Sequence, residues 1–375
     1  MSAFGNSSEW PLVPLKDIAP LKRGYDLPVS RREEGNIPIY AANGKNGTHS
    51  EAKIVGPGVI TGRSGTIGKV HYSEGDYWPL NTSLYVTNFR GNDPRWVFYM
   101  LKAFRLERFS EGAGVPTLNR NLIHDELIPL PPLAEQKRIA AILDKADAIR
   151  RKRQQAIQLA DDFLRAVFLD MFGDPVTNPK GWQVVMLSDV VFFQEGPGVR
   201  NWQFKDSGIK LLNVKNIVNG NLVLGNSDKY LSKDEVFTKY PHFLAEPDDL
   251  VMASSGATWG KSAWVDDSHL PLCMNTSTIR FHPLDTSILD RHYMHGFLKS
   301  SSFRQQIEKM ITGSAQPNFG PTHLKQVKIM LPPSKEQSRY SNILTSLYET
   351  MSKMSAEVSG DLFASLSQKA FRGEL

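Results

Sequence analysis

The chain contains one long pattern twice, and this duplication constrains its fold more than any other feature. Landmarks of the first copy recur in the same order in the second: Trp10, Leu15 and Asp17 as Trp182, Leu187 and Asp189; Gly68-Lys69 as Gly260-Lys261; Asn81-Thr82-Ser83 as Asn275-Thr276-Ser277; and Glu135-Gln136 as Glu336-Gln337. The offset between copies grows from 172 to 201 residues, so about 29 residues are inserted in the second copy. Two repeats of this length exclude a solenoid and predict a tandem pair of domain-sized units.

Length and composition fit such a pair. A chain of 375 residues suggests two or three domains, and 41% hydrophobic with 22% charged residues is globular composition. No apolar stretch approaches the ~20 residues of a membrane span, and the amino terminus lacks the features of a signal peptide. Because Cys273 is the only cysteine, an intrachain disulfide, a thiolate zinc cage and an iron–sulfur cluster are excluded. We expect a cytoplasmic protein with no membrane partner, whose net charge of +5 permits a polyanionic one.

The first part of each copy predicts an α+β fold with a twisted, mostly antiparallel sheet. Short β-like runs alternate with turn signals such as Asn43-Gly44 and Asn219-Gly220. The clearest predicted strands are residues 58–61, 83–87, 209–212 and 278–281. A helical stretch is expected near the end of each part, over residues 96–109 and 291–309.

The second part of each copy is predicted to be a long helix. After Pro131-Pro132, neither Pro nor Gly occurs until Gly173, and apolar residues repeat every 3.5 positions on average. The residues expected to pair the helices are Ile139, Ile142, Ala146, Ile149, Ala156 and Phe163 in the first, and Ile343, Leu347 and Met354 in the second. The first helix leads out to the second domain and the second leads back, so they should form an antiparallel coiled coil. Gly360 interrupts the second helix.

These elements predict a pseudo-twofold symmetric arrangement of two similar domains separated by two long antiparallel helices. The expected boundaries are residues 1–130 for the first domain, 131–173 for the first helix, 174–331 for the second domain and 332–375 for the second helix.

No catalytic or metal-binding constellation is evident in the sequence. An adenine methyltransferase needs an acidic residue or Asn before Pro-Pro, and Leu130 and Leu331 stand there instead. Residues 255–262 almost match a phosphate-binding loop, but Ser255 replaces its first Gly, so we expect a strand–turn–strand corner. The nine histidines show no zinc-ligand spacing. Binding is therefore the better interpretation than catalysis.

Polar residues gather around the two repeated Gly-Lys corners. Arg, Lys and Asn side chains read base edges and clamp phosphates, and Ser and Thr hydroxyls also contact DNA. The candidate DNA-binding residues are Asn43, Lys45, Asn46, Arg63, Ser64, Thr66 and Lys69 in the first copy, and Asn213, Lys215, Asn216, Ser254, Ser255, Thr258 and Lys261 in the second. The alternative is that these residues only furnish hairpin turns. The basic run at residues 150–153 is either a solvated helix face or a contact for phosphate or protein.

Several of these motifs together carry a family resemblance. Residues 36–86, with Ile37-Pro38, the run from Gly58 to Lys69 and the segment from Trp78 to Thr82, strongly resemble a target-recognition domain of type I restriction–modification specificity subunits. Residues 312–318, followed by Leu331-Pro-Pro and Glu336-Gln337, are similar to the same family, and residues 369–375 look like its usual ending. The resemblance covers nearly the whole chain.

The resemblance implies a DNA-binding subunit without catalysis of its own. Each recognition domain would read one half of a bipartite site in double-stranded DNA, and the paired helices would act as a ruler. Two adenine methyltransferase subunits, which bind S-adenosylmethionine, would dock on the helices, and a restriction subunit would join them. This chain would bind no cofactor. Deleting the heptad from Ala146 to Lys152 with its matching segment should shorten the gap between half-sites.

Two alternatives belong to other functional classes. The chain could be a stand-alone DNA-binding protein, such as a repressor, that acts without a methyltransferase. It could also be an interaction scaffold whose domains bind something other than DNA. A steep salt dependence of binding would separate a DNA-binding protein from a scaffold.

Overall fold

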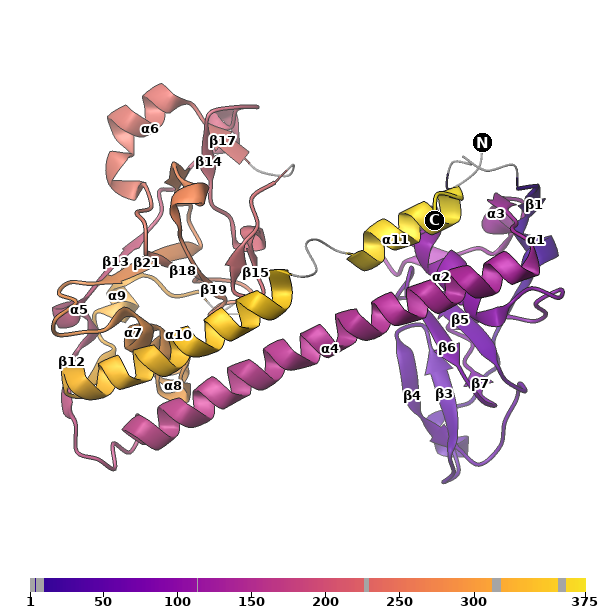
Figure 1. Ribbon diagram of the computed structural model, residues 1–375, viewed down its shortest axis with the longest axis horizontal. Helices are drawn as coiled ribbons and strands as arrows, with labels where there is room; N and C mark the ends of the chain where they lie inside the picture. The colour runs from indigo at the N-terminus through magenta and orange to yellow at the C-terminus, as the bar shows by residue number, and fades with distance from the viewer. Residues whose placement is uncertain (1–3, 5–9, 113, 226–228, 312–317, 357–361) are drawn as a thin grey trace. The chain divides into compact units, whose positions relative to one another are not determined.

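The computed structural model describes residues 4, 10–112, 114–225, 229–311, 318–356 and 362–375 (Figure 1). The chain forms two compact units. Unit 1 contains residues 1–156 and 356–375, and unit 2 contains residues 157–355. The boundary falls inside one long helix, so each unit combines a sheet domain with parts of the predicted helical segments.

Unit 1 is built on two sheets. The order of the four-stranded antiparallel sheet is β2 (Leu21–Arg23), β8 (Ser83–Val86), β5 (Gly58–Gly62) and β6 (Val70–Ser73). The order of the three-stranded sheet is β4 (Gly44–His49), β3 (Ile37–Ala41) and β7 (Trp78–Pro79), with β3 and β7 parallel. Two further pairs are β1 (Leu12–Pro14) with β11 (Leu127–Pro129) and β9 (Ser110–Glu111) with β10 (Thr117–Leu118). The helices are α1 (Leu15–Ile18), α2 (Pro94–Ala103) and α3 (Asn121–His124).

Unit 2 repeats this topology. Its four-stranded sheet has the order β13 (Val191–Glu195), β21 (Thr278–Pro283), β18 (Leu250–Ala253) and β19 (Ser262–Trp264). Its three-stranded sheet has the order β17 (Lys229–Leu231), β14 (Ile209–Leu211) and β20 (Leu272–Cys273), and β12 (Gln183–Met186) pairs with β22 (Lys328–Leu331). The helices are α5 (Leu187–Val190), α6 (Lys233–Lys239), α7 (Arg291–Leu298), α8 (Ser301–Met310) and α9 (Pro321–Leu324). The matching strand orders confirm the predicted α+β duplication.

The structure explains why the offset between the copies grows. In unit 1, β3 leads directly into β4 through a tight turn, whereas in unit 2 the paired strands β15 (Ile217–Val218) and β16 (Asn221–Leu222) lie between β14 and β17. Helix α6 then follows β17. In unit 1, α2 is followed by a short 3-10 turn, whereas in unit 2 its counterpart α7 is followed by a second helix, α8. The inserted residues therefore lengthen the connections between the shared strands and leave the strand order unchanged.

One capped helix packs across the sheet in each unit. The Asp93 side chain accepts a hydrogen bond from the Trp96 N–H at 2.8 Å, and Asp290 caps α7 in the same way. This capping satisfies amide groups that the first helical turn leaves unpaired. The ring of Trp96 is fully buried in the core of unit 1, and Tyr293, its counterpart in α7, is fully buried in unit 2.

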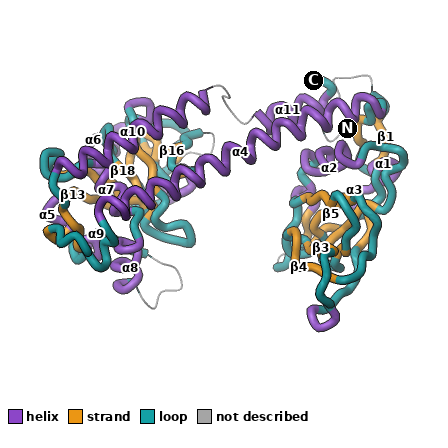
Figure 2. The backbone as a smooth tube through the Cα atoms, turned by 60° about the horizontal axis from the view of Figure 1, so that its bottom comes forward, coloured by secondary structure: helices purple, strands orange, loops and turns teal. Residues whose placement is uncertain are grey.

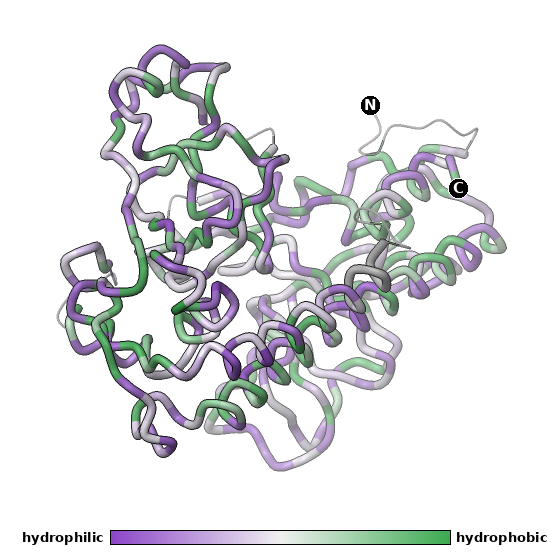
Figure 3. The backbone as a smooth tube through the Cα atoms, turned by 60° about the vertical axis from the view of Figure 1, so that its left-hand side comes forward, coloured by the Kyte–Doolittle hydropathy of each residue, from purple (hydrophilic) through white to green (hydrophobic). Residues whose placement is uncertain are grey.

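Helix α4 (Leu133–Phe172) is the long helix predicted after Pro131-Pro132. Its 40 residues span about 60 Å at ~1.5 Å per residue. The second helical segment comprises α10 (Ser334–Ala356) and α11 (Leu362–Arg372), and Gly360 lies outside the described residues. Hydrophobic and hydrophilic residues alternate along these helices, as expected for helices with one packed face (Figure 3).

Contacts within each unit confirm the antiparallel pairing of the helices (Figure 2). In unit 1, Arg138 near the start of α4 donates a hydrogen bond to the Leu375 carbonyl at 3.0 Å. Further along α4, the Arg150 guanidinium lies 5.5 Å from the ring of Phe363 in α11. In unit 2, the Phe168 and Phe172 rings at the end of α4 lie 5.7 and 5.5 Å from the Tyr340 ring near the start of α10.

The packed face of α4 differs from the predicted seam. Ile149 and Phe163 are 47% and 49% exposed, whereas Leu143, Leu164 and Phe168 are buried. Near the end of α4 the packed face lies one residue after the predicted seam, a turn of ~100°, whereas near its start the face includes the seam residues Ile139 and Ala146 together with Leu143. Buried polar residues also belong to this face, and a count of apolar residues does not register them. Of the other seam residues, Ile139 and Ala146 are buried, Ile142, Ala156, Ile343 and Leu347 are half-buried, and the Met354 side chain is outside the described part of the chain.

Candidate nucleic-acid interface

Both Gly-Lys corners connect neighbouring strands. Residues 63–69 join β5 to β6, and residues 254–261 join β18 to β19. Gly65 and Gly68 adopt φ values of +88° and +89°, and Gly256 and Gly260 adopt +77° and +86°. Glycine reaches this left-handed region without steric cost, which explains why it recurs in both corners. A phosphate-binding loop would lead from a strand into a helix, so the structure supports the predicted strand–turn–strand corner.

In unit 1, the corner meets three other connections of the sheet domain. The Arg63 N–H donates to the Thr82 carbonyl at 2.9 Å, and the Leu118 N–H donates to the Arg63 carbonyl at 2.8 Å. The Ala42 N–H donates to the Thr82 hydroxyl at 3.4 Å. The turn after β3, the corner after β5, the loop after β7 and the strand β10 therefore lie side by side. We call this group of connections the recognition cluster of unit 1.

Unit 2 builds its recognition cluster on the same backbone frame. The Ser254 N–H donates to the Ser277 carbonyl at 2.9 Å, and the Phe319 N–H donates to the Ser254 carbonyl at 3.0 Å. These bonds match those of Arg63 in unit 1, so Ser254 occupies the position of Arg63. The Asn275 side-chain amide also donates to the Asn213 side-chain oxygen at 2.9 Å, which brings the residue after β14 into the cluster.

Most predicted DNA-binding residues have accessible side chains, but two do not. The exposed residues are Asn43, Lys45, Asn46, Lys69, Lys215, Thr258 and Lys261, and the half-buried ones are Arg63, Ser64, Thr66, Asn213 and Ser255. Asn216 is buried, and its amide donates to the Val223 carbonyl at 3.0 Å while its oxygen accepts from the Asn213 N–H at 2.9 Å. Ser254 is fully buried. For these two residues the structure corrects the sequence prediction: the Asn216 side chain holds the loop, and the Ser254 hydroxyl is buried with no hydrogen-bond partner among the described residues.

Arg63 is the basic residue most firmly held within the unit 1 cluster. Its Nε donates to the Asn81 carbonyl at 3.0 Å. The Asn81 side chain in turn donates to the carboxylate of Asp26, which lies in the connection between β2 and β3. These bonds fix the position of the Arg63 guanidinium before any ligand arrives, which lowers the entropy cost of a contact.

One further connection in each unit lies beside the cluster and was not predicted from the sequence. It joins the first strand of the four-stranded sheet to the strand that follows in the chain. In unit 1 this connection contains the 3-10 turn η1 (Val29–Arg31), and in unit 2 it contains η3 (Asn201–Gln203). Val29 is 76% exposed and Trp202 is 75% exposed. The sequence signal that could have identified these turns is an apolar residue near arginines, in residues 29–32 and 200–202. Neither stretch shows the alternation of apolar and polar residues that is typical of a strand.

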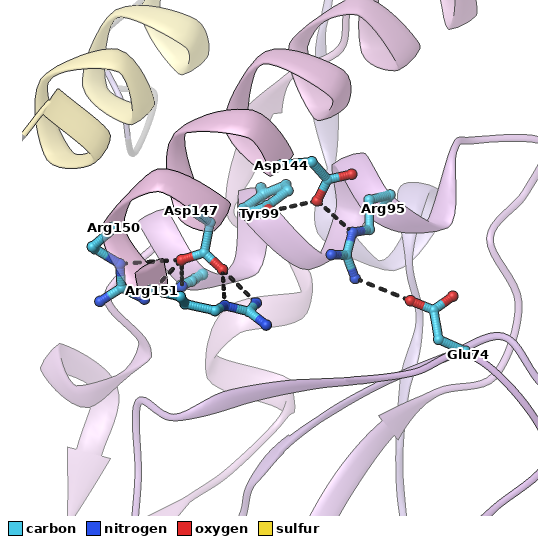
Figure 4. A network of polar contacts seen from close by, with 8 residues as sticks. Glu74, Arg95, Tyr99, Asp144, Asp147, Arg150 and Arg151 are labelled. Atoms are coloured by element: carbon cyan, nitrogen blue, oxygen red, sulfur yellow. Dashed lines mark hydrogen bonds and ion pairs between the residues drawn. The ribbon is translucent and has the colours of Figure 1, made fainter. Parts of the chain in front are cut away.

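The basic run of α4 is organised around a buried carboxylate (Figure 4). Asp147 accepts from Arg150 Nη2 at 2.7 Å and from Arg151 Nε at 2.7 Å, and Lys102 Nζ of α2 lies 3.8 Å away. Burial alone would raise the pKa of Asp147, but the hydrogen bonds from the two arginines outweigh it and hold this pKa below its ordinary value. Part of the basic run therefore neutralises an internal charge, in addition to facing solvent.

A second carboxylate of α4 contacts the same face of α2. Asp144 accepts from Arg95 Nε at 2.7 Å and from the Tyr99 hydroxyl at 2.6 Å. The Arg95 guanidinium also lies 3.7 Å from Glu74, in the connection after β6 (Figure 4). Asp144 and Asp147 therefore anchor α4 to the sheet domain of unit 1.

A buried glutamine joins each long helix to the capped helix of its own unit. In unit 1, Gln136 Oε1 accepts from the Asp93 N–H at 2.9 Å, and its Nε2 donates to the Asn92 side chain at 2.8 Å and the Pro131 carbonyl at 3.0 Å. In unit 2, Gln337 accepts from the Asp290 N–H at 2.8 Å and donates to the carbonyls of Ile288 at 3.0 Å and Pro332 at 2.7 Å. The glutamine of the repeated Glu-Gln pair thus fixes the direction in which each long helix leaves its domain.

Two further observations bear on other classes of function. Within the part of the chain that the structure describes, no group of three or more His, Cys, Asp or Glu side chains is placed to hold a metal ion. Over the same ranges, no helix combines the length and the apolar character needed to cross a bilayer.

Comparison with known proteins identifies relatives of both units. A family model described as the type I restriction modification DNA specificity domain matches residues 7–159 and again residues 179–358. The type I restriction enzyme MjaVIII specificity subunit of Methanocaldococcus jannaschii is 26% identical over 272 residues, which cover 68% of this chain and 63%, less than two thirds, of that subunit. The MjaIX specificity subunit of the same organism is 21% identical and covers 91% of this chain and 87% of its own length. The crystal structure of the type I restriction–modification S subunit from M. genitalium shares the fold, with a TM-score of 0.61, 15% identity and 99% coverage of both chains.

Proposed function

Because this chain belongs to the type I restriction–modification DNA specificity family, we propose that it is the subunit that selects the DNA sequence for such a complex. Each unit reads one half of a bipartite site in double-stranded DNA through its recognition cluster. The chain itself supplies binding and no catalysis. The alternative of a stand-alone repressor or scaffold is not favoured, since both units match the specificity family.

The observation that carries this proposal is that the two recognition clusters share one backbone hydrogen-bond pattern but carry different side chains on it. The same hydrogen bonds surround Arg63 in unit 1 and Ser254 in unit 2, yet one side chain is a cation and the other a small buried hydroxyl. Base readout depends on which donors and acceptors a rigid frame presents to the groove edges. Two equal frames with unequal side chains are therefore suited to two different half-sites.

The exposed cations of the clusters support contact with a polyanion. Lys45 and Lys69 are exposed in unit 1, and Lys215 and Lys261 in unit 2. Lysines at such positions typically contact phosphates, and these contacts set the register of a protein on the duplex without reading sequence. We assign these four residues to phosphate contact and Arg63 to base readout, whereas the Asn213 side chain bonds Leu211 and Asn275 within the cluster.

The long helices serve as the spacer and the docking platform. Two adenine methyltransferase subunits bind the helical region and carry S-adenosylmethionine, and a restriction subunit joins the assembly. The Gln136 and Gln337 bonds support the spacer role, because they fix each helix to its own recognition domain. Residues 152–158 of α4 are exposed or half-buried, whereas the heptad 146–152 contains the buried Asp147. The heptad 152–158, with its matching segment, is thus the better deletion for testing the ruler.

The proposal is tested by co-expressing the chain with its methyltransferase subunits and mapping modified adenines by sequencing. The expected result is one bipartite motif with a fixed gap. Arg63→Ala should relax the half-site read by unit 1 alone, whereas Lys261→Ala should weaken binding to all sequences and reduce the salt dependence. Adenine modification without a bipartite motif, or modification that does not depend on this chain, would refute the proposed function.

A further inference from the structure

A large aromatic side chain next to the recognition cluster of unit 2 is unexpectedly exposed. Trp202 in the 3-10 turn η3 is 75% exposed, although a tryptophan offers more apolar area for burial than any other residue. Exposed aromatic residues beside cations are typical of binding surfaces. Arg200, two residues earlier, is also exposed.

The backbone that carries Trp202 is rigidly held. Gln203, the next residue, is buried, and its Oε1 accepts from the Arg200 N–H at 2.7 Å. Its Nε2 donates to the Glu235 carboxylate at 2.8 Å and to the Tyr240 hydroxyl at 3.1 Å. The turn is therefore fixed against α6 and its C-terminal end while the neighbouring indole ring faces solvent. A ring presented on a fixed turn loses little conformational freedom when it binds.

The turn begins at the recognition cluster of unit 2. The Glu195 carboxylate, at the end of β13, accepts from the Ser277 N–H at 3.4 Å. Gly196 follows, and a Cβ at this position would lie 2.3 Å from the Asn275 backbone nitrogen, so the two backbones are in direct contact. Asn275 and Ser277 are themselves members of the cluster.

Unit 1 has the same feature at the same place in its topology. Val29, in the turn between β2 and β3, is 76% exposed and is followed by two arginines. Arg32 Nη1 donates to the Asn46 carbonyl at 2.8 Å and to its side-chain oxygen at 3.0 Å, which fixes this turn against β4. Both units thus have an exposed apolar residue near arginine at this place in the topology, but the residue is valine in unit 1 and tryptophan in unit 2.

We propose that Trp202 packs its ring against DNA bases at the edge of the half-site read by unit 2, with Arg200 contacting an adjacent phosphate. Apolar side chains inserted at base steps and aromatic rings stacked on bases are established modes of DNA binding. The flanking cation favours a nucleic acid over an apolar protein surface as the occupant. This inference rests on the proposed function and identifies a contact within the same site.

The experiment uses the full chain assembled with its methyltransferase subunits and duplexes that carry its mapped site. Trp202→Ala is compared with Phe237→Ala, which removes a 54% exposed aromatic ring from α6 of the same unit. Loss of one stacked contact should weaken specific binding roughly 5- to 150-fold. The control should stay within about twofold of the wild-type affinity, and Trp202→Phe should recover most of the affinity.

A spectroscopic readout locates the contact on the DNA. A 2-aminopurine base placed in turn at each position in and beside the unit 2 half-site reports local unstacking. We expect the wild-type complex to change the fluorescence at one position, and Trp202→Ala to abolish that change without altering assembly with the methyltransferase.

The outcomes separate this inference from the proposed function. Wild-type affinity and an unchanged 2-aminopurine signal in Trp202→Ala would overturn the contact while leaving sequence selection intact. Loss of methyltransferase association in this variant would make Trp202 a protein contact and would also overturn the inference. A wild-type complex that binds all duplexes equally would instead refute the proposed function.

Discussion

Replacing Gln337 with leucine should loosen unit 2 while leaving unit 1 intact. The substitution keeps the volume of the buried side chain but removes three hydrogen bonds, to the Asp290 N–H and to the carbonyls of Ile288 and Pro332. Each polar group left unpaired in a buried position costs about 1–3 kcal/mol. The Ile288 carbonyl belongs to a residue with partial solvent access, so the expected loss is about 2–4 kcal/mol.

Cys273 provides a selective probe of this change. It is the only cysteine in the chain, it is fully buried in β20 of unit 2, and burial raises the pKa of its thiol to about 12. Reaction with a thiol reagent under native conditions therefore requires unit 2 to open. A loss of 2–4 kcal/mol should accelerate labelling roughly 30- to 1,000-fold, since ~1.4 kcal/mol corresponds to a factor of ten.

Gln136→Leu is the matched control, because the same substitution then removes the equivalent bonds in unit 1. It should destabilise the chain in a denaturant titration yet leave the native-state labelling rate of Cys273 unchanged. Equal acceleration by both variants would show that the two units open together. No acceleration by Gln337→Leu would show that the glutamine does not hold the helix, and either result would refute the reasoning.

Three further predictions follow from buried groups. Phe371→Ala should destabilise unit 1 by about 3–5 kcal/mol without accelerating Cys273 labelling, because the ring is buried in the core of unit 1. Burial lowers the pKa of His295 to about 3, so the unfolded state takes up its proton first and stability falls as the pH drops below about 6.5. Denaturant titrations should show about 2 kcal/mol lost between pH 7.5 and 5, and His295→Gln should flatten this dependence. Asp147→Asn should destabilise unit 1 above about pH 5, and its deficit relative to wild type should shrink as the pH falls through the depressed pKa of this carboxyl, which thermal melts across this range would reveal.

The duplication and the main elements could be predicted from the sequence because they rest on local patterns. The strands β5, β8, β14 and β21 lie where short β-like runs predicted them, and α4 begins directly after Pro131-Pro132. Pro and Gly mark these boundaries through backbone geometry alone, which depends little on the rest of the fold.

The packed face of α4 could not be derived from the same patterns. Gln136 and Asp147 are polar, yet they lie on the buried face. Residues of the cap of α2 satisfy Gln136, whereas Arg150 and Arg151 of α4 itself hydrogen-bond Asp147, with Lys102 of α2 3.8 Å away. A count of apolar residues treats both residues as solvent-facing and therefore misses part of the packed face. The partners that α2 and its cap supply are distant in the sequence, so their contribution is visible only in the folded chain.

The recognition clusters were found only in part for a similar reason. The Gly-Lys corners carry a repeated motif, whereas the turns that contain Val29 and Trp202 share an environment and no sequence identity. Likewise, nothing in the sequence distinguishes the buried Asn216 from the exposed Asn43. Their different roles depend on the inserted segment, in which Val223, directly after β16, supplies its carbonyl as a partner for Asn216.

Helix α11 completes the core of unit 1, although it lies more than 200 residues after the sheets of that unit in the sequence. Ala370 and Phe371 pack with Ile139 and Leu143 of α4, so the hydrophobic interior that begins to form near residue 15 is completed near residue 371. On the ribosome, the second unit has almost all of its chain available before the first can bury its last apolar surface. The domain synthesised first is thus the one that matures last, because its core is complete only once residues 362–372 have been made.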